Sequence, residues 1–198
     1  MISRLRATII LIGTLLISAS HGYSHEITLF SGWTNPGELN LENVRSGLKG
    51  SGIYGARFET DFVPIIGLEH TFGYSPNFVR PEGASFIAGE RARGIIYNTN
   101  IILNAPIGRA IPYVTAGLGL VSSDRAFSAP LVPFVSTGNF GTHFAVNYGG
   151  GIKMVRLAGP LGLRFDVRGY SLPDVFGGSL NFFEVSGGVQ FTFGGHRR

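Results

Sequence analysis

Polar and apolar residues alternate along most of this chain with the period of a β-strand. Segments in which every second residue is apolar, each bounded by turn residues, predict eight strands. They lie at 26–34, 51–62, 65–75, 94–104, 111–121, 142–155, 161–171 and 181–193. No helical periodicity competes with this pattern, so the chain is predicted to be all-β.

The connections between these strands alternate in length. Long connections at 35–50, 76–93 and 122–141 are interleaved with short ones at 62–64, 105–110 and 156–160, and a medium one spans 172–180. Successive connections of a closed up-and-down barrel emerge at opposite ends, so this alternation predicts one elaborated end and one trimmed end. Membrane strands need about 9–11 residues each, which the chain can supply eight times but not sixteen. We therefore predict an eight-stranded antiparallel up-and-down transmembrane β-barrel.

The alternation separates an apolar face from a polar one, most clearly in the strand at 161–171. Leu163, Phe165 and Val167 point one way there, and Arg164 and Asp166 point the other. We predict a polar network in the lumen, made by Arg57, Glu59, Glu69, Lys153, Arg164, Asp166, Arg168 and Glu184. We predict lipid-facing aromatic side chains at Phe58, Phe72, Phe165, Phe183, Phe191 and Phe193.

Alternation alone also fits a soluble, lipocalin-like binding barrel with the two faces reversed. Glycine and aromatic content favour the membrane barrel: the chain has 30 Gly, 12% aromatic residues and only 14% charged residues. Glycine weakens a solvent-facing strand, whereas small residues suit a narrow lumen. Aromatic residues near the strand ends resemble interfacial girdles. They are Trp33, Phe58, Phe62, Phe72, Tyr74, Phe140, Phe144, Tyr170, Phe182, Phe183, Phe191 and Phe193.

Residues 1–24 read as a secretory signal peptide, with Arg4 and Arg6 before an apolar segment and small residues after it. Cleavage before His21 or before His25 both fit, and the second site, which we prefer, leaves 25–198 as the barrel domain. The chain has no Cys, so no disulfide and no lipidated cysteine are expected. The formal charge of +4 is scattered, so no nucleic-acid partner is expected.

No catalytic, cofactor-binding or metal-binding residues are predicted, and the chain is expected not to be an enzyme. His70 and His143 are the candidates for a lipid A modifying hydrolase, but neither has a serine two residues away. The five histidines show no paired metal-ligand spacing. A narrow porin-like channel is the main alternative, although charges of both signs in so small a barrel favour a salt-bridged plug.

Five segments resemble the small outer-membrane β-barrel proteins related to the OmpA transmembrane domain and to OmpX. They are Ile111–Gly119, Asn147–Lys153, Leu163–Arg168, Val189–Phe193 and the signal peptide. The resemblance implies a bacterial outer-membrane location, lipid and lipopolysaccharide as surroundings, and insertion by the barrel-assembly machinery. Family members usually end on an aromatic residue of the last strand, whereas here Phe193 is followed by the tail 194–198.

The expected role is structural, or a surface interaction through long extracellular loops. Those loops are 35–50, 76–93 and 122–141, and the third is unusually apolar. A partner protein or lipopolysaccharide would bind there, and the alternative is a loop that folds back over the barrel mouth.

Overall fold

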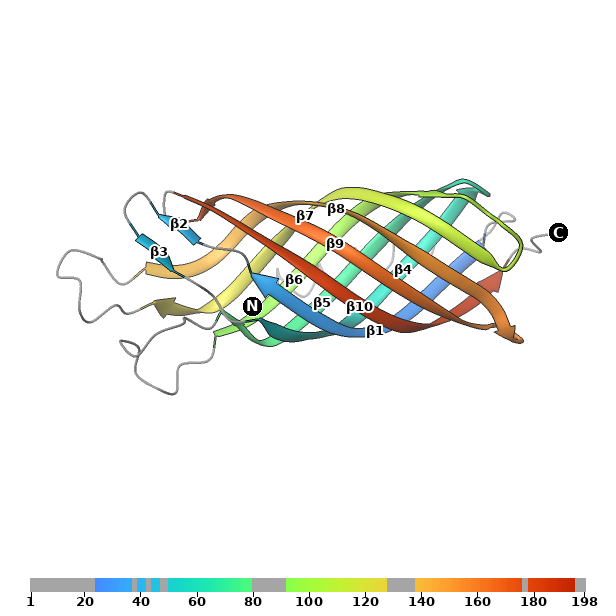
Figure 1. Cartoon of the computed structure of the whole chain (residues 1–198), viewed down its shortest axis with the longest axis horizontal. Coiled ribbons are helices and arrows are strands. Elements are labelled where there is room, and N and C mark those ends of the chain that lie inside the picture. The colour runs from blue at the N-terminus through green and yellow to red at the C-terminus, as the bar shows by residue number, and fades with distance from the viewer. Residues whose placement is uncertain are drawn as a thin grey trace, which may run out of the picture.

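Eight long antiparallel strands close into a barrel in the computed structural model (Figure 1). The structure describes residues 24–36, 39–41, 44–46, 50–79, 92–127, 138–175 and 178–194. The barrel strands are β1 (Ser24–Pro36), β4 (Ser51–Val63), β5 (Ile66–Val79), β6 (Ala92–Asn104), β7 (Ala110–Phe127), β8 (Gly138–Ala158), β9 (Leu161–Val175) and β10 (Gly178–Gly194). Each pairs with its neighbour along the chain, and β1 pairs with β10 from Ser24↔Gly194 to Pro36↔Phe182. The predicted eight-stranded barrel is confirmed.

Several strands are longer than the alternation predicts. The predicted loop 122–141 is partly strand, because β7 continues to Phe127 and β8 begins at Gly138, with Phe127 paired to Gly138. Most of the predicted connection 172–180 is also strand. Backbone pairing between adjacent strands continues past the point where the side chains alternate between the outer wall and the lumen. The sequence pattern therefore stops before the strands do.

A small hairpin lies in the first long connection. Strands β2 (Leu39–Leu41) and β3 (Val44–Ser46) pair with each other, and Asn40 of β2 pairs with Ser179 of β10. The predicted loop 35–50 therefore contains regular structure at the end of the barrel with the long connections (Figure 1). The signal segment 1–23, loop residues 80–91 and 128–137, and the tail 195–198 lie outside the described residues.

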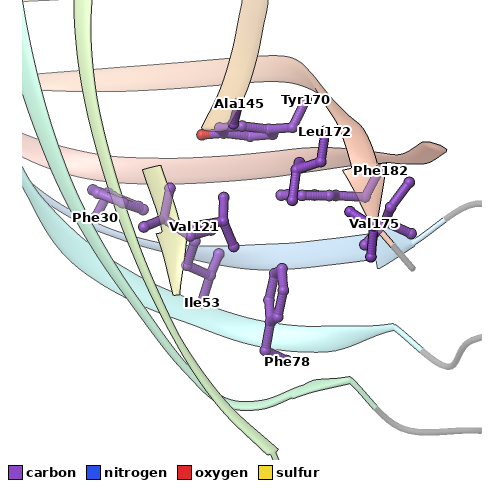
Figure 2. Packing of buried hydrophobic residues seen from close by; sticks show 11 residues of the cluster. Phe30, Ile53, Phe78, Val121, Ala145, Tyr170, Leu172, Val175 and Phe182 are labelled. Carbon is purple, nitrogen blue, oxygen red and sulfur yellow. The ribbon is translucent and has the colours of Figure 1, made fainter. Parts of the chain in front are cut away.

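An apolar cluster fills the lumen at the end with the long connections (Figure 2). Its members are Phe30, Ile53, Phe78, Ile96, Val121, Ala145, Tyr170, Leu172, Val175, Leu180 and Phe182. The Phe182 ring stacks on Tyr170 at 4.6 Å and meets Phe78 edge-on at 5.4 Å. The placement of Tyr170 and Phe182 in an outer girdle is therefore wrong. Both occupy inward positions of their strands, and strand-end aromatics look alike in sequence whichever way they point.

The outer wall of the barrel is apolar. We call its outward-facing positions the apolar belt: residues 27–33 of β1, 54–62 of β4, 68–74 of β5, 95–103 of β6, 114–120 of β7, 144–154 of β8, 161–167 of β9 and 183–193 of β10, taking every second residue from the first of each range. Most of the large aliphatic and aromatic side chains on these positions are exposed, while most of their neighbours along each strand are buried. Within the described part of the chain, no helix has the length and hydrophobicity needed to cross a membrane.

Candidate functional site: the charged lumen and its apolar belt

The middle of the lumen holds a continuous network of ion pairs. All eight residues predicted for the lumen lie in it, together with Glu26. Nine N···O contacts of 2.5–3.2 Å connect these nine side chains into a single network, in which every contact joins a cation to a carboxylate. Every member is almost completely buried. A buried charge requires such compensation, because removing an ion from water costs several kcal/mol.

Asp166 of β9 is the carboxylate shared by the largest number of cations. Its oxygens lie 3.0 Å from Arg57, 3.1 Å from Arg164 and 2.8 Å from Arg168. The Tyr113 hydroxyl also donates a hydrogen bond to it. Arginine suits this position because its planar fork of N–H groups can serve two carboxylates at once. Asp166 thus links strands β4, β7 and β9 across the lumen.

Lys153 of β8 connects the network to the first strand. Its ammonium lies 3.0 Å from Glu26 of β1 and 2.5 Å from Glu59 of β4. Sequence reasoning missed Glu26, although the signal was present: Glu26 and Thr28 alternate with the apolar Ile27 and Leu29 on the other face. Register pairing of Glu26 with Glu59 places two carboxylates side by side, and Lys153 neutralises them.

Two tyrosines join the network to the apolar groups around it. Tyr170 belongs to the apolar cluster, and its hydroxyl donates to Glu184 at 2.9 Å. The Arg164 guanidinium lies 4.6 Å from the centre of the Tyr113 ring. On the other side, the Arg57 guanidinium lies 3.7 Å from the ring centre of Phe30, another member of the apolar cluster. At this distance the Arg57 guanidinium packs directly on the Phe30 ring, so the charged network and the apolar cluster are in contact.

Glycines provide the space that the large lumen side chains need. A Cβ at Gly151 would lie 2.6 Å from the Tyr113 hydroxyl and would also collide with the carbonyl oxygen of Phe165. A Cβ at Gly119 would collide with the side chain of Asn98. At both positions the crowded lumen leaves no room for a larger residue, as expected for small residues in a narrow lumen.

The predicted lipid-facing aromatics all occupy belt positions. Phe72, Phe165, Phe183 and Phe191 are exposed. Phe58 and Phe193 are partly covered, because the ring of His25 stacks between them with centroid distances of 6.1 and 5.6 Å. This aromatic group lies at the end of the barrel with the short turns, where His25 also contacts the Thr60 hydroxyl at 3.2 Å.

The two histidines considered as catalytic candidates are not brought together. His70 lies on the outer face of β5, and His143 lies on β8, with β6 and β7 between them in the sheet. His70 contacts the hydroxyls of Tyr97 and Thr99, and no serine lies beside it in the hydrogen-bond network. Among the described residues, no group of three or more His, Asp or Glu is placed to hold a metal ion.

The interior is therefore a closed plug in the part of the chain that the structure describes. Each cation of the network contacts at least two carboxylates, and the apolar cluster closes the lumen above it. An eight-stranded barrel is only wide enough for its own side chains to fill its interior.

Comparison with solved structures finds the same fold elsewhere. The N-terminal β-barrel domain of Pseudomonas aeruginosa OprF superposes with a TM-score of 0.54 at 16% identity, covering 86% of this chain and 97% of that one. Neisserial surface protein A superposes with a TM-score of 0.56 at 13% identity, covering 87% of this chain and 98% of that one. No protein-family model and no curated protein matches the sequence. The chain thus has the fold of the small OmpA- and OmpX-like outer-membrane barrels, as its sequence motifs predict.

Proposed function

We propose that this protein is a non-enzymatic barrel of the bacterial outer membrane, closed to solutes, that anchors long connections at the cell surface. In this proposal residues 1–24 are removed as a signal peptide, and the barrel-assembly machinery inserts the rest. The connections at 35–50, 76–93 and 122–141 face outward and contact a surface partner or lipopolysaccharide. The fold shared with Neisserial surface protein A supports a surface role.

One observation carries the membrane assignment: the barrel is charged inside and apolar outside. Buried Arg57, Arg164 and Arg168 contrast with exposed Leu29, Phe165 and Val167, which belong to the apolar belt. Soluble monomers rarely expose contiguous apolar patches larger than a few hundred Å². A lipocalin-like soluble barrel requires the opposite arrangement, with an apolar cavity and a polar exterior. Hydrocarbon is the surrounding that matches this outer wall.

Heat modifiability tests the membrane assignment. The full chain is expressed with its signal segment, and cell fractions are compared on denaturing gels with and without boiling. We expect the protein in the outer-membrane fraction with a mobility that shifts on boiling, because a closed barrel resists detergent until it is heated. A soluble periplasmic protein without a shift would contradict the proposal.

Conductance separates the plug from the alternative of a narrow porin-like pore. The refolded barrel in a planar bilayer is expected to give no steady single-channel current, because both the ion-pair network and the apolar cluster block the lumen. A stable open level would favour the pore. Enzymatic action on lipopolysaccharide is a third hypothesis, and activity lost in His70→Ala or His143→Ala would support it.

Surface accessibility tests the orientation. Epitope tags inserted after residues 83 and 132, in the second and third long connections, are expected to be reached by antibody on intact cells. A tag after Gly159, in the short turn between β8 and β9, is the matched control and should stay hidden until the cells are opened. Labelling in the reverse pattern would contradict the proposed orientation.

A further inference from the structure

His70 is an exception within the apolar belt. Among the described belt positions it is the only Asp, Glu, Lys, Arg or His side chain. It lies in the first half of β5, between Leu68 and Phe72 on the outer face, and is only partly exposed. Ionisable side chains within a membrane are rare, and they usually mark a contact with another polar group.

Neighbouring hydroxyls fix one side of the His70 ring. Nδ1 lies 3.1 Å from the Tyr97 hydroxyl and 3.1 Å from the Thr99 hydroxyl, and Thr99 donates to Tyr97 at 3.1 Å. The rings of His70 and Tyr97 stack at 6.2 Å, and Phe72 packs on Tyr97 at 4.8 Å. Thr99 donates to Tyr97, and we assign the His70 hydrogen to Nε2, because Nδ1 then accepts from the Tyr97 hydroxyl and both hydroxyl hydrogens have an acceptor. Nε2 has no hydrogen-bond partner among the described residues.

Lipid supplies no hydrogen-bond acceptor for Nε2–H at the depth of His70 in the membrane. His70 lies four residues from Ile66, the start of β5 at the short-turn end. A strand rise of about 3.3 Å per residue and a tilt of about 40° place His70 roughly 10 Å from the exposed Ile66, within an outer apolar band that is about 25 Å tall in membrane barrels. Lipid phosphates and esters lie near the edges of such a band, so the hydrocarbon supplies no acceptor at His70. A second protein surface can supply one.

We propose that the outer face of β4, β5 and β6 is a dimerisation surface, occupied by a second copy of this chain and centred on His70. The inference rests on the proposed membrane insertion. The hydrogen bonds run from Thr99 through Tyr97 to His70. The Thr99 oxygen can still accept a hydrogen bond, and the Nε2–H of His70 can donate one. In a two-fold dimer, His70 Nε2–H of one copy donates a hydrogen bond to Thr99 of the partner subunit. The symmetry makes the same hydrogen bond a second time, with the two copies exchanged. A two-fold interface uses the same surface on both copies, so that surface must carry both the donor and the acceptor.

The absence of cysteine from the chain makes a clean cross-linking test possible. Ile101→Cys places a thiol on β6 beside Thr99, and Val167→Cys places one on β9 across the barrel. The two parent side chains are almost equally exposed, at 59% and 58%, so the pair is matched for access. Each purified full-length variant is inserted in phospholipid vesicles at low density and oxidised with copper phenanthroline. We expect a disulfide-linked dimer for Ile101→Cys and monomer for Val167→Cys.

His70→Leu in the Ile101→Cys background tests the hydrogen bonds themselves. We expect cross-linked dimer to fall on the order of eightfold, the loss of two membrane hydrogen bonds of average measured strength. Thr99→Val should also lower the amount of cross-linked dimer. Ser31→Val removes a belt hydroxyl on β1, away from His70, Tyr97 and Thr99, and should leave the amount of dimer unchanged. Heat modifiability of each variant verifies that the barrel is folded.

Three results would overturn the proposal: equal cross-linking at the two cysteine positions, no dimer in vesicles, or a dimer unaffected by His70→Leu. A cross-link to another protein in cell membranes, absent from vesicles of the pure chain, would also overturn it and assign the surface to that protein. Vesicle association and the heat shift are measured on the same samples. A chain that fails to insert contradicts the proposed function, whereas an inserted monomer contradicts only the dimer.

Discussion

Asp166→Asn tests whether the ion-pair network holds the barrel together. The substitution keeps the size of the side chain and removes the charge that Arg57, Arg164 and Arg168 share. Breaking a buried ion pair by removing one partner costs about 3–5 kcal/mol, because the remaining charge stays buried without compensation. We therefore expect Asp166→Asn to lower the free energy of unfolding.

The other contacts of the three arginines set the size of this loss. Arg57 retains Glu184 at 2.5 Å, Arg168 retains Glu69 at 2.7 Å, and Arg164 retains Glu69 at 2.6 Å. No guanidinium is left without a carboxylate, so we expect the lower end of the range, about 3 kcal/mol. With a urea dependence of about 2 kcal/mol per molar, the unfolding midpoint should fall by roughly 1.5 M.

Urea unfolding of the barrel in lipid vesicles measures the effect. Trp33 is the single tryptophan and is exposed on the belt, so its fluorescence reports transfer from lipid to water. Glu184→Gln is the matched control, because Glu184 pairs with one cation, Arg57, and should cost clearly less. The reasoning is refuted if Asp166→Asn changes the free energy of unfolding by less than about 1 kcal/mol, or by less than the control.

Two further substitutions probe the packing of the lumen and the surroundings of the belt. Gly151→Ala should destabilise the barrel by about 1–3 kcal/mol, because the new Cβ would collide with the backbone carbonyl oxygen of Phe165 and lie 2.6 Å from the Tyr113 hydroxyl. The refolding yield in vesicles and the urea midpoint measure this effect, and a wild-type midpoint would show that the lumen can relax. Phe165→Arg, in the middle of the belt, should cost about 2–4 kcal/mol in lipid, whereas Ile107→Arg in a short turn should cost about 0–1. Equal costs at the two positions would mean that the belt does not face hydrocarbon.

Alternation was enough to predict the strands and their two faces. In β9 the sequence Leu161–Arg168 assigns each residue to lumen or lipid, because a slip of one residue would reverse every side chain. The same signal is present in β1 at Glu26, which was not among the predicted lumen residues. The ends of the strands were harder to predict. Strands β7 and β8 stay paired as far as Phe127 and Gly138 through backbone hydrogen bonds, which impose no side-chain pattern.

The sequence did not predict which side chains contact each other across the lumen. Alternation gives the face of Tyr113 but not its partner, and Asp166 lies on another strand at a height fixed by strand tilt and register. Tyr170 and Phe182 show the same limit, since an aromatic residue near a strand end suits a girdle and a lumen cluster equally. His70 was visible in the sequence, but only the register with Thr99 reveals its hydroxyl neighbours.

The ion pairs of the lumen also constrain the order in which the molecule can assemble. Lys153 with Glu26 and Arg57 with Glu184 each join positions 127 residues apart, so the early strands hold charges whose partners arrive near the end of synthesis. In the proposed outer-membrane location, an open sheet of the first strands would expose those charges to hydrocarbon if it inserted alone. Insertion and closure must therefore proceed together, and the seam between β1 and β10 forms as the last charges are neutralised. High sequence separation of this kind predicts slow, all-or-none folding, in which half-built barrels stay outside the bilayer.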